Sequence, residues 1–297
     1  MRTAIIGAGN MGGSIARGLA KGSIIPASDI TVSNPSQGKL DELQAEFPAL
    51  QITHDNQEAI IGAEFIILAV KPWLIKGVLR ELKLKSKQII ISVAAGINFE
   101  ELAHYVPEPE MTMFRIIPNT AISEMESMTL IASRNATKEQ EQLMLDIFNQ
   151  MGLAMLIPEE KFAACTSMAS CGIAYVLKYI QAAMQAGIEM GVYPKDAMRM
   201  VAQSVKGAAE LILNNDTHPS VEIDKVCTPG GITIKGINEL EHDGYTSAID
   251  AYHHAPFEYK GEFLSGMAVI VYRFALRFRF YGYYKRISTT IHEACGK

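Results

Sequence analysis

Short β-rich runs alternate with segments of helical spacing through the first 157 residues, and this alternation constrains the fold more than any other feature. The β-rich runs are TAIIG (3–7), DITVS (29–33), EFIILAV (64–70), QIIISVAAG (88–96), MTMFRII (111–117), MTLIAS (128–133) and LAMLIP (153–158). Helical spacing occupies several of the intervals between them, at 11–21, 38–47 and 137–152. Strands that are apolar on both faces and alternate with helices predict an α/β fold with a mostly parallel sheet.

The strand signals stop near residue 160. The stretch 161–192 is rich in Ala, Met and Leu and lacks proline, which predicts one long, mostly buried helix. A second helix is predicted to begin at Pro194, and two more to lie on either side of Gly244. We therefore expect three parts: a sheet domain at 1–158, an all-α domain at 159–262, and an extension of unknown structure at 263–297.

Composition narrows the class of protein. The net charge of −5 gives no electrostatic reason to expect nucleic acid or an anionic membrane as a partner. The four cysteines show no C-x-x-C spacing, and the first residues run directly into a strand rather than a signal peptide. The apolar run at 263–272 is too short for a membrane span, which needs about 20 residues. These features predict a soluble, reduced, cytoplasmic protein.

A glycine pattern, G-x-G-x-x-G, follows the first predicted strand and opens the first predicted helix. Gly7 permits a tight turn, Gly9 lets the backbone approach a pyrophosphate, and Gly12 lets helix and strand pack closely. Asn10 and Met11 lie at the helix N-terminus, where free N–H groups attract phosphate. In this context the pattern predicts a Rossmann-like, doubly wound dinucleotide-binding domain. The alternative is a glycine-rich turn without a ligand.

The end of the second predicted strand bears on which dinucleotide binds. NAD-selective sites usually place a carboxylate there, whereas this chain reads VSNPSQGK with no acid before Asp41. Asn34, Ser36 and Lys39 would accept a 2′-phosphate, which favours NADPH, with NADH as the alternative. The alternative is that this segment is a solvated loop without a ligand.

Three further segments should reach the same edge of the sheet, because ligands bind at the carboxyl ends of parallel strands. LAVKPWL contributes four candidates, Ala69, Val70, Lys71 and Pro72, of which Lys71 either faces the cofactor or is simply solvated. SVAAGI contributes Ala94, and RIIPNTA contributes Asn119 as a polar contact for a nicotinamide or substrate. We expect all of them in the cofactor site.

Far along the chain, KVCTPGGITIKG is either a turn between helices or a pocket that grips an anion with bare N–H groups. Gly230 and Gly231 lack side chains, so consecutive amides can turn inward. Together with GAGNMG, AVKP, SVAAGI and PNT, this segment resembles pyrroline-5-carboxylate reductase, with the motifs in the family's order over about residues 1 to 260.

The resemblance implies an activity and an assembly. Family members reduce the cyclic imine Δ1-pyrroline-5-carboxylate to L-proline with NADPH or NADH, the last step of proline biosynthesis. Their helical C-terminal half builds a tight homodimer, and dimers can assemble into rings. The chain is accordingly expected to be an NAD(P)H-dependent oxidoreductase acting on a C=N bond, with a small-molecule substrate.

The resemblance also assigns roles to the late loop and the long helix. Thr228, Gly230, Gly231 and Ile232 match the loop that cups the substrate carboxylate. Thr233 matches the threonine expected to hydrogen-bond the ring nitrogen, and it is the catalytic candidate, with a polarising and positioning role.

The chain departs from the family pattern at the stretch ASCGIAY, 169–175. Cys171, a substrate-binding candidate, stands where a serine is expected, and Ile173 where a proline is expected. Losing the proline should straighten the start of the helix and leave the pocket intact. The loop also has Cys227 and Ile232 in place of hydroxyl residues. Two alternatives therefore stay open: a reductase of another cyclic imine or small oxo-acid, and a non-catalytic NADP-binding sensor or scaffold.

Two other features carry no motif. His253 and His254 are adjacent on a predicted helix and point about 100° apart, so no metal site is expected. The tail, 263–297, does not match the family, and its arginines lie among aromatic residues. It is a partner-binding or membrane-surface element, an extra strand or helix packed on the domain or the dimer partner, or a poorly ordered extension.

Overall fold

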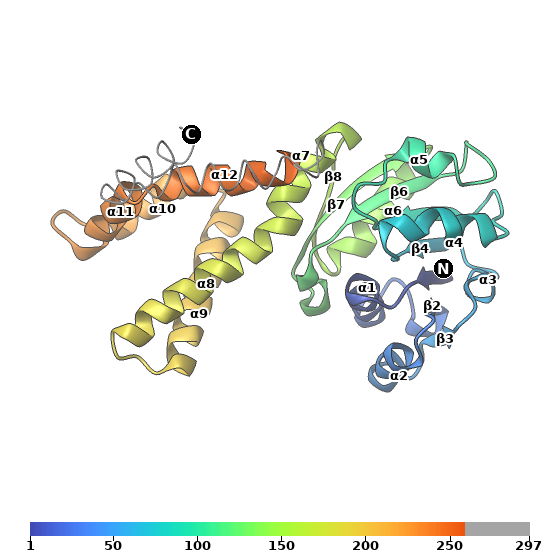
Figure 1. Ribbon diagram of the computed structural model, residues 1–297, viewed down its shortest axis with the longest axis horizontal. Helices are drawn as coiled ribbons and strands as arrows, with labels where there is room; N and C mark the ends of the chain where they lie inside the picture. Colours follow the sequence, from blue (N-terminus) through green and yellow to red (C-terminus); the bar gives the residue numbers. More distant parts are fainter. Residues whose placement is uncertain (259–297) are drawn as a thin grey trace, which may run out of the picture. The chain divides into compact units, whose positions relative to one another are not determined.

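The computed structural model describes residues 1–258, so the tail predicted at 263–297 lies outside the described residues (Figure 1). The chain divides into two compact units, Met1–Glu239 and a second that begins at Leu240.

A single sheet organises the first unit (Figure 1). Its order is β3-β2-β1-β4-β5-β6-β7-β8, and all neighbours are parallel except β6 and β7. The strands are β1 (Thr3–Ile6), β2 (Ile30–Ser33), β3 (Gln51–Thr53), β4 (Phe65–Leu68), β5 (Ile89–Ser92), β6 (Met113–Ile117), β7 (Ser127–Arg134) and β8 (Gly152–Leu156). All seven β-rich runs overlap a strand, whereas β3 was not predicted.

Helices cover both faces of this sheet. Ile5 and Ile67 lie in a core that α1, α2 and α6 cover, whereas Ile6 and Ile66 lie in a second core, covered by α3, α4 and α5. The helices are α1 (Asn10–Lys21), α2 (Gln37–Glu46), α3 (Asn56–Ala59), α4 (Ile75–Glu81), α5 (Phe99–Ala103) and α6 (Lys138–Asn149). The central strands are buried on both sides, as their continuous apolar runs predicted. The doubly wound α/β fold is confirmed.

The helical part of the chain also has the predicted outline. One long helix, Glu159–Glu189, is followed by α9, which begins at Pro194 as its fixed φ favours. The elements are α7 (Phe162–Thr166), a π turn (Ser167–Cys171), α8 (Gly172–Glu189), α9 (Pro194–Asn215), α10 (Pro219–Val226), α11 (Ile232–His242) and α12 (Tyr245–Glu258). Helix α10 was not predicted.

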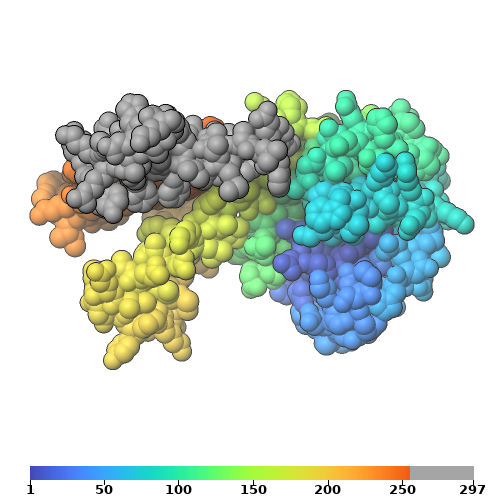
Figure 2. Space-filling view, in the orientation of Figure 1, coloured from blue at the N-terminus to red at the C-terminus, as the bar shows by residue number. Residues whose placement is uncertain are grey.

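The expectation that the stretch 161–192 is mostly buried is wrong. Helix α8 has no buried residue, and α9 has one, Ala197, which packs against Gly187 of α8. Large apolar side chains are instead exposed on both helices: Val176, Leu177, Tyr179, Ile188, Met198, Met200, Leu211 and Leu213. Figure 2 shows part of the surface of these two helices (yellow). By length and composition alone, Glu159–Glu189 is also apolar enough to cross a membrane. The exposed apolar side chains of α8 and α9 therefore indicate a surface suited to packing against a partner.

Candidate functional site

The glycine turn lies where the strand order of the sheet reverses, between β1 and β4. Gly7 leaves β1 with φ of +103°, a conformation that L side chains rarely adopt. A Cβ there would meet the carbonyl oxygen of Ala69 at 2.7 Å, because the residue after β4 packs directly against the turn. Gly7 thus holds the close approach of two strand ends at the crevice where doubly wound sheets bind ligands.

Gly12 and Gly9 differ in what surrounds them. A Cβ on Gly12 would lie 1.9 Å from the carbonyl oxygen of Gly7, so only glycine lets α1 sit this close to β1. A Cβ on Gly9 would meet nothing within 4 Å. Gly9 therefore faces open space, as a site for an approaching pyrophosphate requires.

The N-terminus of α1 is prepared for a negative charge. Gly9 is its N-cap, no side chain caps the helix, and no acidic residue lies in its first turn. The amides of Asn10, Met11 and Gly12 at this end have no intrahelical partners, since the first intrahelical N–H belongs to Gly13. These residues fit a bound dinucleotide pyrophosphate, with the helix dipole adding favourable electrostatics.

Asn34 has a task that the sequence did not reveal. Its side-chain oxygen accepts a hydrogen bond from the Ala8 N–H at 3.0 Å, and its amide nitrogen donates to the Ser36 carbonyl oxygen at 3.1 Å. The residue is only 8% exposed. Its side chain thus joins the glycine turn to the loop after β2, and its binding of a 2′-phosphate stays a prediction.

His54 extends this connection from β3, and the sequence analysis did not select it. Its ring lies between two oxygens: the Asn34 carbonyl is 2.7 Å from Nδ1, and the Gln37 side-chain oxygen is 2.6 Å from Nε2. Ser36 and Lys39 flank Gln37 and are exposed. Helix α2 has neither a side-chain cap nor an acid in its first turn, so this loop suits a phosphate.

The residues after β4 and β5 reach the same edge of the sheet. Ala69 donates its N–H to the Ile6 carbonyl oxygen at 2.9 Å, which places the segment beside the glycine turn. Val70 is partly buried, Lys71 is exposed, and Pro72 begins a short 3₁₀ turn, Pro72–Leu74. Trp73 on this turn is 75% exposed and is the single tryptophan of the chain. It was not selected from the sequence.

Ala94 follows β5, and its contacts belong to the second core. The residue is 5% exposed, and its N–H donates to the Ser92 hydroxyl at 3.3 Å. Only its backbone is thus suited to face a ligand.

Asn119 follows β6 and is 7% exposed. Its side-chain oxygen accepts from the Ala121 N–H at 3.0 Å, and its side-chain nitrogen donates to the Ala169 carbonyl oxygen at 3.2 Å. The structure therefore brings Asn119 together with the stretch that contains Cys171, although 50 residues separate Asn119 from Ala169. Its contact with a nicotinamide remains a prediction.

The start of the long helix departs from regular α-helical hydrogen bonding, which the sequence analysis did not predict. Residues Ser167–Cys171 form a π turn, in which hydrogen bonds span five residues instead of four. Cys171 ends this turn and is a free, partly buried thiol. Burial raises the pKa of the Tyr175 phenol above its ordinary value, and the nearby Cys171 adds to this rise.

The late loop is a turn closed by a backbone hydrogen bond, and its binding of an anion stays a prediction. Gly230 has φ of +72°, and the Gly231 N–H donates to the Thr228 carbonyl oxygen at 2.9 Å. Ile232 begins α11 and is 87% exposed, and Thr233 is partly buried in the first turn of that helix. Among the described residues, no hydrogen bond joins the stretch 228–233 to the cofactor edge of the sheet.

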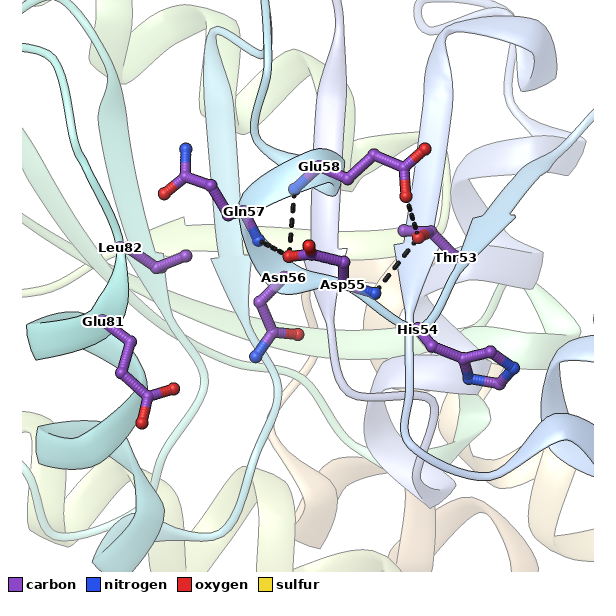
Figure 3. Close-up of a pocket in the computed structure, with 8 residues that line it drawn as sticks. All are labelled: Thr53, His54, Asp55, Asn56, Gln57, Glu58, Glu81 and Leu82. Carbon is purple, nitrogen blue, oxygen red and sulfur yellow. Dashed lines mark hydrogen bonds between the residues drawn. The ribbon is translucent and has the colours of Figure 1, made fainter.

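A surface groove of about 690 Å³ lies beside His54 and is distinct from the predicted cofactor site (Figure 3). It is lined by Thr53, His54, Asp55, Asn56, Gln57, Glu58, Glu81 and Leu82. Asp55 caps α3 by accepting from the N–H groups of Gln57 and Glu58. Three carboxylates make the groove unsuitable for phosphate, and none of the predicted site residues lines it.

The fold and the glycine turn define a dinucleotide-binding protein of the doubly wound α/β class. Two family models match the chain: an F420-dependent NADP oxidoreductase model over residues 2–96 and a pyrroline-5-carboxylate reductase dimerisation model over residues 159–262. The matches cover both the sheet part and the helical part.

Individual relatives agree with these models. Pyrroline-5-carboxylate reductase 2 of Dictyostelium discoideum is 38% identical over 262 residues, covering 83% of this chain and 87% of that protein. Pyrroline-5-carboxylate reductase 1 of the same organism is 34% identical, and the match covers 47% of its length. The crystal structure of Plasmodium falciparum pyrroline carboxylate reductase with NADP bound superposes with a TM-score of 0.79, at 27% identity, over 87% of this chain and 96% of that one. The chain belongs to the pyrroline-5-carboxylate reductase family.

Proposed function

We propose that this chain reduces Δ1-pyrroline-5-carboxylate to L-proline with a hydride from NADPH, as the last step of proline biosynthesis. The observation that carries the proposal is the conjunction of two anion-binding turns. One is the open backbone of Gly9 at the uncapped start of α1, and the other is the Gly230–Gly231 turn that leads into α11. A dinucleotide needs the first, and a carboxylate substrate needs the second.

The chain's residues bind and orient the cofactor. The amides of Asn10, Met11 and Gly12 hold the pyrophosphate, while Ser36 and Lys39 receive the 2′-phosphate and favour NADPH over NADH. When bound, the reduced nicotinamide supplies the hydride. The protein then has to fix the position of the imine carbon, since orientation alone contributes much of the rate.

The late loop holds the substrate. The N–H groups of Gly230 and Ile232 bind the ring carboxylate, whereas the Gly231 N–H holds the turn closed by donating to the Thr228 carbonyl oxygen; the dipole of α11 adds to the attraction. The Thr233 hydroxyl, in the first turn of the same helix, hydrogen-bonds the ring nitrogen. A protonated imine accepts hydride far better than a neutral one. Threonine is too weak an acid to supply that proton alone, so its role is to polarise and position the ring.

The helices α8 and α9 supply the surface for a homodimer. Their exposed leucines, Leu177 and Leu213, are 58% and 69% exposed, and such a surface is expected to pair with a second copy. The dimerisation model that matches residues 159–262 supports this assignment and a domain boundary near Pro158. We expect the enzyme to act in the cytoplasm, as a homodimer or a larger homo-oligomer.

The test is consumption of NADPH with pyrroline-5-carboxylate as substrate, beside pyrroline-2-carboxylate and NADH as controls. Rapid oxidation with the first substrate is expected. Turnover only with another imine or oxo-acid would change the assigned substrate. The departures from the family pattern at Cys171 and Ile173 would fit that outcome. Binding of NADPH with no turnover on any of them would leave a sensor or scaffold.

Two substitutions separate the parts of the late loop. Gly230→Val forces a side chain into a positive-φ position and should raise the KM for the imine by more than about tenfold while NADPH binding stays unchanged. Thr233→Ala should lower kcat by about tenfold to a hundredfold, with Thr233→Ser restoring most of it. An unchanged KM for the imine in Gly230→Val would show that this turn does not bind the substrate carboxylate.

Mixing the Gly12→Val variant, which should not bind NADPH, with the weakly active Thr233→Ala variant locates the two turns within the assembly. Recovered activity in the mixture means that the loop of one chain serves the sheet edge of its partner. No recovery means that each chain uses its own loop.

A further inference from the structure

The helix that follows the sheet is interrupted by the π turn at Ser167–Cys171. A π turn contains one residue more than a regular α-helical turn, and such turns are rare and concentrated at functional sites. Each residue of an α-helix advances the side chain by about 100°, so one extra residue changes which face the following helix presents. The turn therefore sets the orientation of all side chains on α8 relative to α7.

The local sequence makes this turn inexpensive to form. The Thr166 hydroxyl donates to the Phe162 carbonyl oxygen at 2.6 Å, four residues back, and thus competes with the backbone ladder. Gly172, the residue directly after the turn, adds backbone freedom. Neither feature selects a π turn over a regular one, so a contact from outside the helix is needed.

Asn119 supplies that contact. Its side-chain nitrogen donates to the Ala169 carbonyl oxygen inside the turn at 3.2 Å. The asparagine itself is fixed: its oxygen accepts from the Ala121 N–H, its own N–H donates to the Ser127 hydroxyl at 3.1 Å, and it is 7% exposed. A rigid donor on the end of β6 thus reaches into the helix ladder, which is a recognised cause of local helix distortion.

What depends on the turn is the exposed surface beyond it. Phe162 of α7 is buried in the second core and anchors the near end of the long helix. On α8, Leu177 is 58% exposed and Tyr179 is 49% exposed. If the turn became regular, these side chains would rotate by about 100° relative to the anchored end.

We propose that Asn119 is a positioning residue that holds the π turn through the Ala169 carbonyl oxygen and so sets the face of α8 that pairs with a second copy of this chain. The proposal rests on the homodimer proposed above. Cys171 lies at the end of the same turn, so its position depends on the same hydrogen bond.

The test is a double-mutant cycle measured on the full-length protein. Asn119→Asp keeps an oxygen for the Ala121 N–H and replaces the donor to Ala169 by an oxygen that repels the Ala169 carbonyl oxygen, so it breaks the proposed bond. The dimer dissociation constant, followed by light scattering, should rise by about tenfold or more. Hydrogen exchange in peptides covering 167–175 should accelerate in the same variant.

Deletion of Met168 provides the second arm. This residue lies within the turn and is 69% exposed, so its removal leaves a helix of regular length without disturbing a packed side chain. In this background the face of α8 is set without the π turn, and adding Asn119→Asp should change the dimer dissociation constant by less than about twofold. Such non-additivity is the signature of action through the turn.

Other results overturn the inference. An equal effect of Asn119→Asp with and without Met168 would show that the residue does not act through the turn. A raised dissociation constant for NADPH, measured by Trp73 fluorescence, with an unchanged dimer would make Asn119 a cofactor contact instead. A wild-type chain that stays monomeric would remove the pairing face itself. A dimer without reductase activity would contradict only the proposed reaction, because the dimer dissociation constant, hydrogen exchange and NADPH binding are measured without turnover. Thermal melting of each variant checks that it folds.

Discussion

The sheet part of the chain and the helices that follow it treat their apolar residues in opposite ways. Phe114 and Phe148 in the sheet part are 0% and 1% exposed, whereas α8 has no buried residue and α9 has one. Both parts are rich in leucine, isoleucine and methionine. The sheet part can bury these side chains because helices cover both of its faces, whereas α8 and α9, among the described residues, pack mainly against each other. The difference teaches that the first part completes its core with its own helices, whereas the α8–α9 surface stays exposed among the described residues and is the surface that the proposed homodimer would cover.

The largest expected effect tests the completeness of the sheet part. Gly12→Ala places a Cβ 1.9 Å from the Gly7 carbonyl oxygen, so α1 must move away from β1. We expect a loss of about 1–3 kcal/mol in the free energy of unfolding and NADPH binding weakened on the order of a hundredfold. Denaturant unfolding and a fluorescence titration measure the two effects.

Gly9→Ala is the matched control, because a Cβ there meets nothing in the chain. Its stability should equal that of the wild type while its NADPH affinity falls. Equal stability losses in the two variants would contradict the assignment of Gly9 to the pyrophosphate.

The next effect tests the incompleteness of the helical part. Leu177→Lys or Leu213→Lys should raise the dimer dissociation constant by about tenfold to a hundredfold, since each side chain contributes about 1.5–3 kcal/mol when buried. Ile61, on the sheet part, is 70% exposed, similar to Leu213. Ile61→Lys should leave the dimer unchanged. Analytical ultracentrifugation measures the dimer dissociation constant of all three variants. An equal rise in all of them would contradict the contrast between the sheet part and the helical part.

A smaller effect is expected from His54, whose contacts with Asn34 and Gln37 support the loop proposed to bind the 2′-phosphate. His54→Ala removes both contacts of the ring with Asn34 and Gln37, so the loop that bears Ser36 and Lys39 loses its support. We expect the KM for NADPH to rise by about threefold to tenfold with kcat unchanged, and the KM for NADH to stay within about twofold.

His104→Ala is the control for this change. His104 is also exposed, and its ring bonds a backbone oxygen, that of Glu100, away from the loop. Equal shifts for NADPH and NADH in His54→Ala would show that the loop does not read the 2′-phosphate.

Much of the fold was predictable because its signals are local. Gly7, Gly9 and Gly12 lie at most five residues apart and identify a turn whose geometry is largely fixed by local sterics. Pro194 likewise marks the helix start at which it was expected. Strand β3 escaped because it has three residues, none fully buried, and therefore lacks an apolar run.

The rest depends on contacts that periodicity does not contain. Apolar content at 161–192 predicted a mostly buried helix, and this was wrong because apolar content does not show what covers a helix. The π turn depends on Asn119, 50 residues away from Ala169, and the loss of a proline at Ile173 gave no hint of it. The role of Asn34 was missed for the same reason, because its partner Ala8 lies 26 residues back in the chain.

The smallest effect sharpens the comparison through pH. Arg17 on α1 bonds Glu46 on α2 through Nε and Nη2 at 2.7–3.0 Å, and this hydrogen bond lowers the pKa of Glu46 below its ordinary value. A carboxyl group with a lowered folded-state pKa stabilises the fold above its ordinary pKa range and loses that contribution as the pH falls through the lowered value. Because Glu46 is 46% exposed, we expect Arg17→Gln to cost less than about 1 kcal/mol near neutral pH. In unfolding experiments the difference between wild type and variant should disappear in strong acid, and a difference that persists there would assign the effect to lost packing of the Arg17 side chain. The dimer dissociation constant should be the same for both proteins at neutral pH, because this pair lies in the part of the chain that completes its own core.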